Sequence, residues 1–241
     1  METYTKIKVD VQGNAMECLK FEPAGNGVCP GVIVMQHIPI SHEGLEKDPF
    51  TINIGERFAK AGYVAVIPYI FHWWSPEVDI ATKREQWRDD RLLADLDAAH
   101  DVLKGIERVD PVRLAVMGHC WGGRMAWLIA GSRPGYKVAG VLYGGRIKVA
   151  MGEGAVPPVE LTSNMTCDMI GIFGNDDQNP SPEDVKDLND ALDVAGVAHE
   201  FHCYDDAGHG FQDFMNEERY RQEASDDAWR KLMNYFDARL K

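Results

Sequence analysis

The amino-acid sequence predicts a single α/β domain, residues 1–241, with a mostly parallel central sheet and helices on both of its faces. Short β-branched, apolar runs alternate with stretches of helical spacing along most of the chain. These runs read apolar on both faces, which is typical of strands that helices cover from two sides. The chain has 241 residues, of which 45% are hydrophobic, so it is long enough for one substantial core. Sheets of this kind bind ligands at the carboxyl ends of their strands.

The predicted elements follow in a regular order. Residues 1–21 alternate polar and apolar side chains, which predicts an N-terminal hairpin. A segment rich in Gly, Pro and Ser, residues 151–168, is expected to be a long connection inside the same domain. The expected strands after the hairpin cover residues 31–36, 63–68, 113–118, 137–145, 169–175 and 199–205. The expected helices cover residues 54–62, 80–106, 121–133, 182–196 and, at the end, a range near 217–240.

Charge and composition narrow the class of partner. The chain carries 38 acidic and 25 basic residues, a net charge of -13, which disfavours nucleic acid and anionic membranes because both attract basic surfaces. No stretch approaches the roughly 20 apolar residues of a membrane span, and the alternating N-terminal segment lacks the apolar core of a signal peptide. Five cysteines without CxxC spacing favour free thiols in a reducing cytoplasm. We expect a cytoplasmic protein, a monomer or a homodimer, that acts on a small molecule.

One glycine-flanked cysteine stands where a predicted strand meets a predicted helix. In GHCWGG, residues 118–123, Cys120 follows the strand 113–118 and precedes the helix 121–133. A nucleophile on such a strained turn needs small neighbours, as in the G-x-S-x-G elbow. The helix N-terminus favours a thiolate, and the N–H of Trp121 can face a developing oxyanion. The alternative is that Cys120 is a small side chain at a tight joint, without chemistry.

A base and an acid for this cysteine follow later in the chain. Asp177 lies just after the predicted strand 169–175, and His209 lies just after the predicted strand 199–205. The order nucleophile, acid, histidine is that of α/β-hydrolases, and all three side chains fall at the carboxyl ends of predicted strands. We expect His209 to be the base and one of the two neighbouring carboxylates, Asp177 or Asp176, to orient it.

At these residues the sequence resembles the dienelactone hydrolase family, a branch of the α/β-hydrolases that uses a cysteine nucleophile. The matching segments, in the order and spacing of the family, are GVIVMQHI, RFAKAGYVAVIP, VMGHCWGG, GIFGNDDQNP and YDDAGHGF. The resemblance implies an α/β-hydrolase fold and a triad of Cys120, His209 and Asp177. It also implies that the backbone N–H groups of Trp121 and Ile38 form the oxyanion hole.

A first departure from the family pattern concerns the resting thiol. The family commonly has a glutamate in a Q-E-I-F-G turn, whereas this chain reads Q-H-I-P-I and has His37 at the position of the glutamate. We expect His37 at the substrate site, where an imidazole near the thiol favours the thiolate and changes how the resting enzyme is activated.

A second departure concerns the substrate. The family's founding activity binds a substrate carboxylate with two arginines, and the aligned positions here are Trp73 and Asp213. A dienelactone is therefore not the expected substrate. His72, Trp73 and Trp74 follow a predicted strand and would form an aromatic wall for a neutral or aromatic substrate, whereas the alternative is that they pack the domain or a dimer interface. Arg146, just beyond another predicted strand, is a candidate for binding a substrate anion.

The function that the sequence favours is hydrolysis of a small ester or lactone through a thioester on Cys120. Two alternatives stay open: a ligand-binding protein without catalysis on the same scaffold, and cleavage of a carbon–carbon bond by the same triad. No residue pattern requires a metal or an organic cofactor, because the histidines lack the spacing of a zinc site. The other cysteines are expected to be structural: Cys18, Cys29, Cys167 and Cys203.

Overall fold

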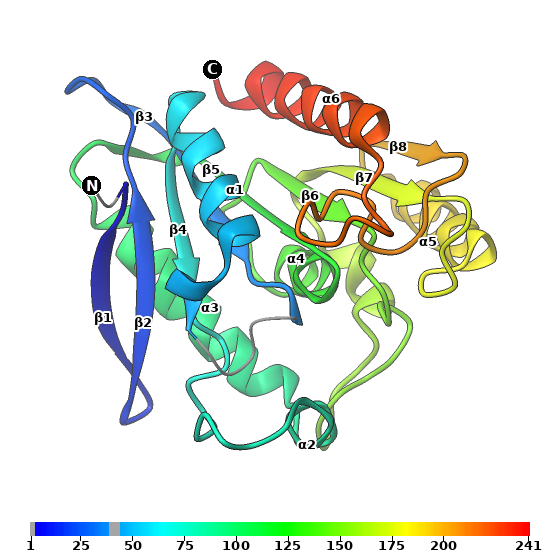
Figure 1. The fold of residues 1–241 in the computed structure, drawn as a ribbon, viewed down its shortest axis with the longest axis horizontal. Helices are drawn as coiled ribbons and strands as arrows, with labels where there is room; N and C mark the ends of the chain where they lie inside the picture. Colours follow the sequence, from blue (N-terminus) through cyan, green and yellow to red (C-terminus); the bar gives the residue numbers. More distant parts are fainter. Residues whose placement is uncertain (1–2, 39–43) are drawn as a thin grey trace.

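Eight strands form one sheet in the residues that the computed structural model describes, 3–38 and 44–241 (Figure 1). The strands are β1 Thr5–Val11, β2 Asn14–Phe21, β3 Cys29–Met35, β4 Val64–Pro68, β5 Val109–His119, β6 Val138–Leu142, β7 Asp168–Gly174 and β8 His199–Tyr204. Their order across the sheet is β1-β2-β4-β3-β5-β6-β7-β8. The hairpin β1–β2 is antiparallel and joins β4 in antiparallel register, whereas every pairing from β4 to β8 is parallel. This topology confirms the predicted hairpin and the mostly parallel sheet.

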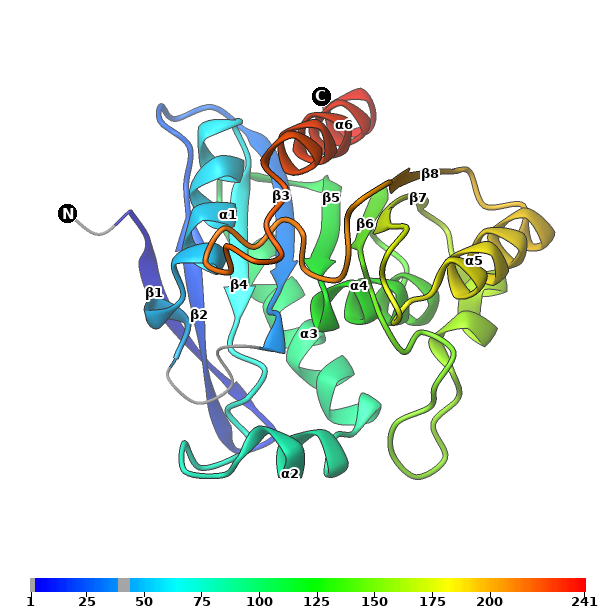
Figure 2. The ribbon, with the colours of Figure 1, turned by 45° about the vertical axis from the view of Figure 1, so that its right-hand side comes forward.

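Helices cover both faces of this sheet. They are α1 Pro49–Lys60, α2 Ile80–Glu85, α3 Asp89–Lys104, α4 Trp121–Ser132, α5 Pro182–Ala195 and α6 Gln222–Leu240, with short 3-10 helices η2 Leu45–Lys47 and η3 Pro158–Asn164. The helices α1 and α6 pack on one face, and α3, α4 and α5 pack on the other (Figure 1; Figure 2). In β3, Val32 and Val34 join the apolar layer under α1 and α6, while Ile33 and Met35 join the opposite layer. Alternate side chains of one buried strand thus fill two apolar layers, as the sequence predicts.

The ends of α5 follow from local sequence signals. The Ser181 side chain accepts a hydrogen bond from the N–H of Asp184, and the Asp184 carboxylate accepts one from the N–H of Ser181, which is a capping box. Gly196 ends the helix in the left-handed conformation, with φ 69°. The bounds of α5 agree closely with the predicted helix 182–196.

The predicted helix 80–106 is wrong as one element, because the chain forms α2 and α3 with a break between them. Around the break, Trp87 is buried against Trp121, with ring centroids 5.0 Å apart. The N–H of Asp89 donates to the carbonyl of Met151 at 2.9 Å instead of to a helical carbonyl. Tertiary contacts therefore override a local helical preference at this point.

Two further segments differ from prediction at their ends. The closing helix α6 begins later than predicted, at Gln222, because the N–H of Arg221 donates to the carbonyl of Phe211 at 2.9 Å. The predicted connection 151–168 contains η3, which packs against α4. The loop between β8 and α6 consequently stays outside the closing helix, and it carries His209.

Candidate active site

Cys120 occupies a sharp turn between β5 and α4. Its backbone has φ 57° and ψ -119°, a strained combination for a residue with a side chain. Glycines make the turn possible: a Cβ on Gly118 would lie 2.4 Å from the backbone of Gly122, and one on Gly122 would lie 2.5 Å from the carbonyl oxygen of Met35. The sequence GHCWGG therefore folds as a sharp strand-to-helix elbow that leaves the Cys120 side chain partly exposed.

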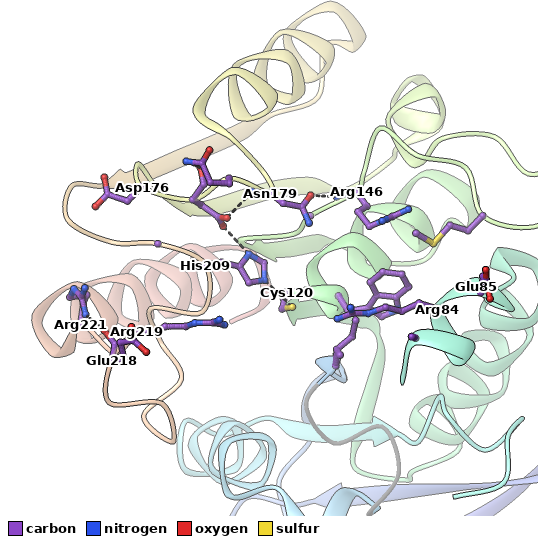
Figure 3. A pocket seen from close by; sticks show the side chains of 18 residues that line it. Arg84, Glu85, Cys120, Arg146, Asp176, Asn179, His209, Glu218, Arg219 and Arg221 are labelled. Atoms are coloured by element: carbon purple, nitrogen blue, oxygen red, sulfur yellow. Dashed lines mark hydrogen bonds and ion pairs between the residues drawn. The ribbon is translucent and has the colours of Figure 1, made fainter. Parts of the chain in front are cut away.

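Three side chains from the carboxyl edge of the sheet meet at this turn (Figure 3). The Nε2 atom of His209 lies 3.0 Å from the Cys120 sulfur, and its Nδ1 atom lies 2.9 Å from Oδ2 of Asp177. Because a carboxylate only accepts hydrogen bonds, Nδ1 carries a hydrogen and donates it to Asp177. The second oxygen of Asp177 accepts the N–H of Asn179 at 2.8 Å, and the side chain of Asp177 is only 2% exposed. Asp176, the alternative acid, is exposed, and the carboxylate bonded to His209 is that of Asp177.

The charges around His209 favour its protonated form. Burial disfavours an imidazolium, but the hydrogen bonds to Asp177 and Cys120 outweigh burial and raise the pKa of His209 to about 10. The protonated imidazole at 3.0 Å and the N-terminus of α4 both place positive potential at the Cys120 sulfur. The buried cysteines differ, because burial raises the pKa of Cys18 and that of Cys167 to about 12. These two thiols therefore stay protonated and unreactive at neutral pH.

The two predicted oxyanion donors border the same cavity as the sulfur. Trp121 is the first residue of α4, and N–H groups in the first turn of a helix have no acceptor within the helix. Ile38 lies shortly after the carboxyl end of β3, next to β5, and both residues line the cavity that contains Cys120. Both residues thus lie at the cavity in which a substrate carbonyl would meet the sulfur, as an oxyanion hole requires.

The cavity has a volume of about 1100 Å³, and charged side chains form much of its wall. Arg84 of α2 and Arg219 of the loop before α6 reach into it from opposite sides of Cys120 (Figure 3). Arg146 lines it as well, beyond the end of β6. Within residues 3–38 and 44–241, the guanidinium groups of these three arginines have no hydrogen bond or ion pair. Arg221 differs, because backbone carbonyls hold its guanidinium.

The predicted aromatic wall is not part of this cavity. None of His72, Trp73 and Trp74 is among the described residues that line it. Asp95 holds the first two, at 2.8 Å from Nε2 of His72 and 3.0 Å from Nε1 of Trp73, and Trp74 donates its indole N–H to Gln86. Trp74 also stacks on a buried tryptophan, with ring centroids 5.9 Å apart. The buried carboxylate of Asp95 draws His72 and Trp73 toward α3, so the structure favours the packing alternative over a substrate wall.

His37 also lies outside the wall of the cavity. Its Nε2 atom is 2.7 Å from Asp48, its side chain is 6% exposed, and its ring packs against Phe50. Asp48 in turn caps the N-terminus of α1 by accepting the N–H groups of Phe50 and Thr51. Burial opposes the charge of Asp48, but the hydrogen bonds to His37 and Thr51 outweigh it and lower the pKa of Asp48. His37 is therefore bound to the start of α1 and not to the thiol.

Three residues of the site were not singled out from the sequence. Asn179 lies two residues after Asp177 in GIFGNDDQNP, and this short separation could have suggested their contact. Arg84 had no comparable signal, because it reaches the cavity only through the break between α2 and α3. Arg219 had none either, because it follows His209 at the end of an irregular loop whose path the sequence does not determine.

Metal-binding clusters and membrane-spanning helices are both absent from the described residues. Among residues 3–38 and 44–241 no group of three or more His, Cys, Asp or Glu side chains suits a metal ion. In the same part of the chain, no helix has the length and apolar character that crossing a membrane demands. All five cysteines are free thiols.

Known proteins with similar sequences carry names of lactone-cleaving enzymes. A protein from Methylorubrum extorquens named as a carboxymethylenebutenolidase is 30% identical over 244 residues, which cover 96% of this chain and 79% of that protein. A protein with the same name from Escherichia coli is 30% identical over 236 residues, covering 93% and 83%. A protein from Bradyrhizobium named as a 2-oxo-3-(5-oxofuran-2-ylidene)propanoate lactonase is 27% identical over 243 residues, covering 97% and 94%. Each of the three names marks the activity as inferred.

Solved structures and a family model agree with these relatives. A crystal structure from Klebsiella pneumoniae, assigned by inference as a dienelactone hydrolase, has a TM-score of 0.81 at 27% identity and covers 97% of this chain and 98% of its own. A dienelactone hydrolase-like promiscuous phosphotriesterase from metagenomic libraries has a TM-score of 0.80 at 17% identity, covers 99% of both chains and shows the fold alone. The model of the dienelactone hydrolase family matches residues 16–240. The chain therefore belongs to the dienelactone hydrolase family, a family of ester and lactone hydrolases with the α/β-hydrolase fold.

Proposed function

We propose that this protein hydrolyses small esters or lactones through a thioester on Cys120. The observation that carries the proposal is the unbroken chain of contacts from Asp177 through His209 to Cys120, with 2.9 Å and 3.0 Å between the bonded atoms. Acyl transfer requires a nucleophile, a base within its reach and a group that orients the base. Membership of the dienelactone hydrolase family agrees with this reaction.

In the first half of the reaction, the Cys120 sulfur attacks the carbonyl carbon of the substrate. The sulfur attacks as a thiolate whose proton is already held at Nε2 of His209, and Asp177 keeps Nδ1 protonated and stabilises the imidazolium. The carbonyl oxygen becomes an oxyanion, to which the N–H groups of Trp121 and Ile38 donate hydrogen bonds. The oxyanion then re-forms the carbonyl, the bond to the leaving oxygen breaks, and His209 gives its proton to that oxygen. The acyl group stays on Cys120 as a thioester.

In the second half, a water molecule attacks the thioester carbonyl. His209 accepts a proton from the water at Nε2, and the same N–H groups stabilise the second oxyanion. The carbon–sulfur bond then breaks, the acid leaves, and the thiolate remains beside the protonated imidazole. The high pKa of His209 suits this last step, because a stable imidazolium stabilises the departing thiolate.

The wall of the cavity supports an anionic substrate in place of the neutral or aromatic one expected from the sequence. Arg84, Arg146 and Arg219 bring guanidinium groups to the cavity of Cys120, and no residue in the described part of the chain bonds to these groups. A guanidinium binds a carboxylate through paired, charge-assisted hydrogen bonds. The names of the relatives, a carboxymethylenebutenolidase and a propanoate lactonase, also describe carboxylate-bearing substrates. We therefore propose an ester or lactone that carries a carboxylate near the scissile bond.

The experiment that tests this function compares two p-nitrophenyl esters of similar length. The glutarate monoester carries a free carboxylate, and the valerate ester has a methyl group at the corresponding end. We expect turnover of both, a higher kcat/KM for the glutarate ester, and loss of turnover in Cys120→Ala. The matched control is Cys203→Ala, which removes an exposed cysteine outside the cavity.

Two outcomes would count against the proposal. Retained turnover in Cys120→Ala would exclude Cys120 as the nucleophile. If neither ester nor any small lactone reacts, while the compounds still bind, the alternative of a binding protein on a hydrolase scaffold is favoured. Cleavage of a carbon–carbon bond by the same triad would appear as turnover of a ring-opened diketone but of no ester.

A further inference from the structure

Arg124 is a fully buried arginine on the helix of the nucleophile. It lies one turn after Cys120 in α4, and its side chain is 0% exposed. Its Nη1 and Nη2 atoms donate to the two oxygens of Asp89, at 2.7 Å and 2.9 Å. Asp89 is the first residue of α3 and its side chain is 5% exposed. A buried pair of this kind persists only where further hydrogen bonds satisfy both ions.

Those further bonds go to one segment of the cavity wall, residues 146–151. Arg124 donates from Nε to the carbonyl of Arg146 at 3.2 Å and from Nη2 to the carbonyl of Val149 at 2.8 Å. Asp89 accepts the N–H of Met151 at 3.2 Å, and its own N–H donates to the carbonyl of Met151 at 2.9 Å. The ion pair thus binds this segment at its start, in its middle and at its end.

The segment begins with a strained residue that faces the cavity. Arg146 has φ 58°, in the left-handed region that favours glycine. Its N–H donates to the side-chain oxygen of Asn179 at 3.2 Å, and the N–H of Asn179 donates to the catalytic Asp177 at 2.8 Å. Arg124 binds the other side of the same residue, at its carbonyl. The backbone of Arg146 is therefore fixed between the triad and the buried pair, while its guanidinium has no partner among the residues that the structure describes.

A second ion pair joins α3 to α4, and it is exposed to solvent. Arg133, at the end of α4, donates from Nε and Nη2 to the carboxylate of Asp97 in α3, at 2.9 Å and 3.1 Å. The side chains of this pair are 42% and 48% exposed. It links the same two helices, but it makes no contact with residues 146–151 among the hydrogen bonds of the described chain. Arg124 and Asp89 differ from that pair because they form hydrogen bonds to residues 146–151 of the cavity wall.

We propose that Arg124 and Asp89 are positioning residues for substrate recognition: they hold residues 146–151 so that Arg146 presents its guanidinium to a carboxylate of the substrate. This inference rests on the proposed function for its choice of substrate. The proposal also explains why a strained position, where glycine would be favoured, holds an arginine. Only a long cationic side chain brings a charge from that point of the backbone into the cavity. Neither Arg124 nor Asp89 lines the cavity, so both act on the substrate only through the lining residues that they contact, of which Arg146 is the one with a guanidinium.

The test is a double-mutant cycle on the glutarate and valerate esters. Arg146→Ala is expected to raise KM for the glutarate ester about tenfold relative to the valerate ester, which is the loss of one charge-assisted contact. Arg124→Met is expected to raise the same ratio by a similar factor. The double variant is expected to show the same ratio of KM values as Arg146→Ala, because without the Arg146 side chain Arg124 has no guanidinium to position. The matched control is Arg133→Met, with an unchanged ratio.

Two companion variants guard against a simple loss of folding. Arg124→Met with Asp89→Asn leaves no unpaired buried charge, so it is expected to fold while it lacks the hold on residues 146–151. Arg124→Lys keeps the charge next to Asp89, but one ammonium lacks the fork geometry needed to reach Asp89, Arg146 and Val149 together. It is expected to keep the fold and still raise the ratio of KM values. Full recovery by Arg124→Lys, or additive effects in the cycle, would overturn the inference.

A measurement without turnover separates this inference from the proposed function. Hydrogen exchange of a peptide that spans residues 145–152 is expected to be faster in both Arg124→Met variants and unchanged in Arg133→Met. Free glutarate is expected to slow the labelling of Cys120 by iodoacetamide, and this protection is expected to fall in the Arg124 variants. If no ester reacts but exchange and protection change as stated, the proposed function fails and the positioning role stands. Unchanged exchange or protection in folded Arg124 variants would overturn the positioning role.

Discussion

The Nε2 atom of His209 lies 3.0 Å from the sulfur of Cys120, although the two residues are 89 positions apart in the chain. The contact forms because β5 and β8 are parallel strands of one sheet, so the turn after β5 and the loop after β8 meet at the same edge. Asp177, after β7, binds the other nitrogen of the same ring. The chemistry proposed for this protein depends on that one histidine having both partners.

Replacing the acid tests the role of the second partner. Asp177→Asn is expected to lower kcat by about a thousandfold or more, because the amide no longer fixes the imidazole tautomer or stabilises its charge. Asp176→Asn changes a neighbouring exposed carboxylate and is expected to lower kcat by less than about tenfold. Steady-state kinetics on the glutarate ester measure both. Equal losses in the two variants would contradict the assignment of Asp177.

The pKa of His209 links stability to pH. It is raised from the ordinary value of 6.5 to about 10 in the folded protein, so the folded state holds the proton more tightly than the unfolded chain. The stabilisation from this proton is full below pH 6.5 and is lost as the pH rises toward 10. We expect the difference in melting temperature between the unmodified protein and His209→Gln to shrink over this window. A difference that stays constant or grows with pH would show that the pKa is not raised.

The glycines of the elbow are expected to be needed for folding. In Gly118→Ala the new Cβ would lie 2.4 Å from the backbone of Gly122, which has no flexible end that can move aside. We expect a loss of about 3 kcal/mol or more in the free energy of unfolding. Gly27→Ala is the control, because its Cβ meets nothing within 4 Å, and its effect is expected to stay within about 0.5 kcal/mol. Urea unfolding compares the two, and similar stabilities would refute the steric account.

The arginines on opposite sides of Cys120 are expected to select the substrate by charge. Arg84→Ala and Arg219→Ala are each expected to lower kcat/KM for the glutarate ester about tenfold relative to the valerate ester, because each removes a charge-assisted hydrogen bond. Lys186→Ala removes an exposed charge of α5 outside the cavity and is the control. Equal effects on both esters would mean that these arginines do not bind the carboxylate.

The sheet and the meeting of Cys120, His209 and Asp177 at one edge of it were predictable because each leaves a local signal. Apolar runs with turn residues between them mark the strands, and GHCWGG marks the elbow through glycines that sterics require. The carboxyl ends of parallel strands then bring Asp177 and His209 to one edge without any knowledge of the loops.

The wall of the cavity was not predictable in the same way. Trp73 follows a strand, as a wall residue would, but the buried carboxylate of Asp95, 22 positions later, binds its indole and turns it toward α3. Arg84 and Arg219 enter the cavity because of a helix break and an irregular loop, which tertiary contacts set. His37 has the sequence position of an active-site residue, yet Asp48 binds it. For each of these side chains, contacts with residues elsewhere in the sequence determine where it lies.

The most direct test of the central claim is to trap the acyl-enzyme. The protein is mixed with the glutarate ester, quenched in acid within the first turnovers, digested and analysed by mass spectrometry. The account predicts one acyl group on the peptide that contains Cys120, labile to hydroxylamine and absent from Cys120→Ala. Turnover without this adduct, or an acyl group on another residue with activity retained in Cys120→Ala, would contradict it.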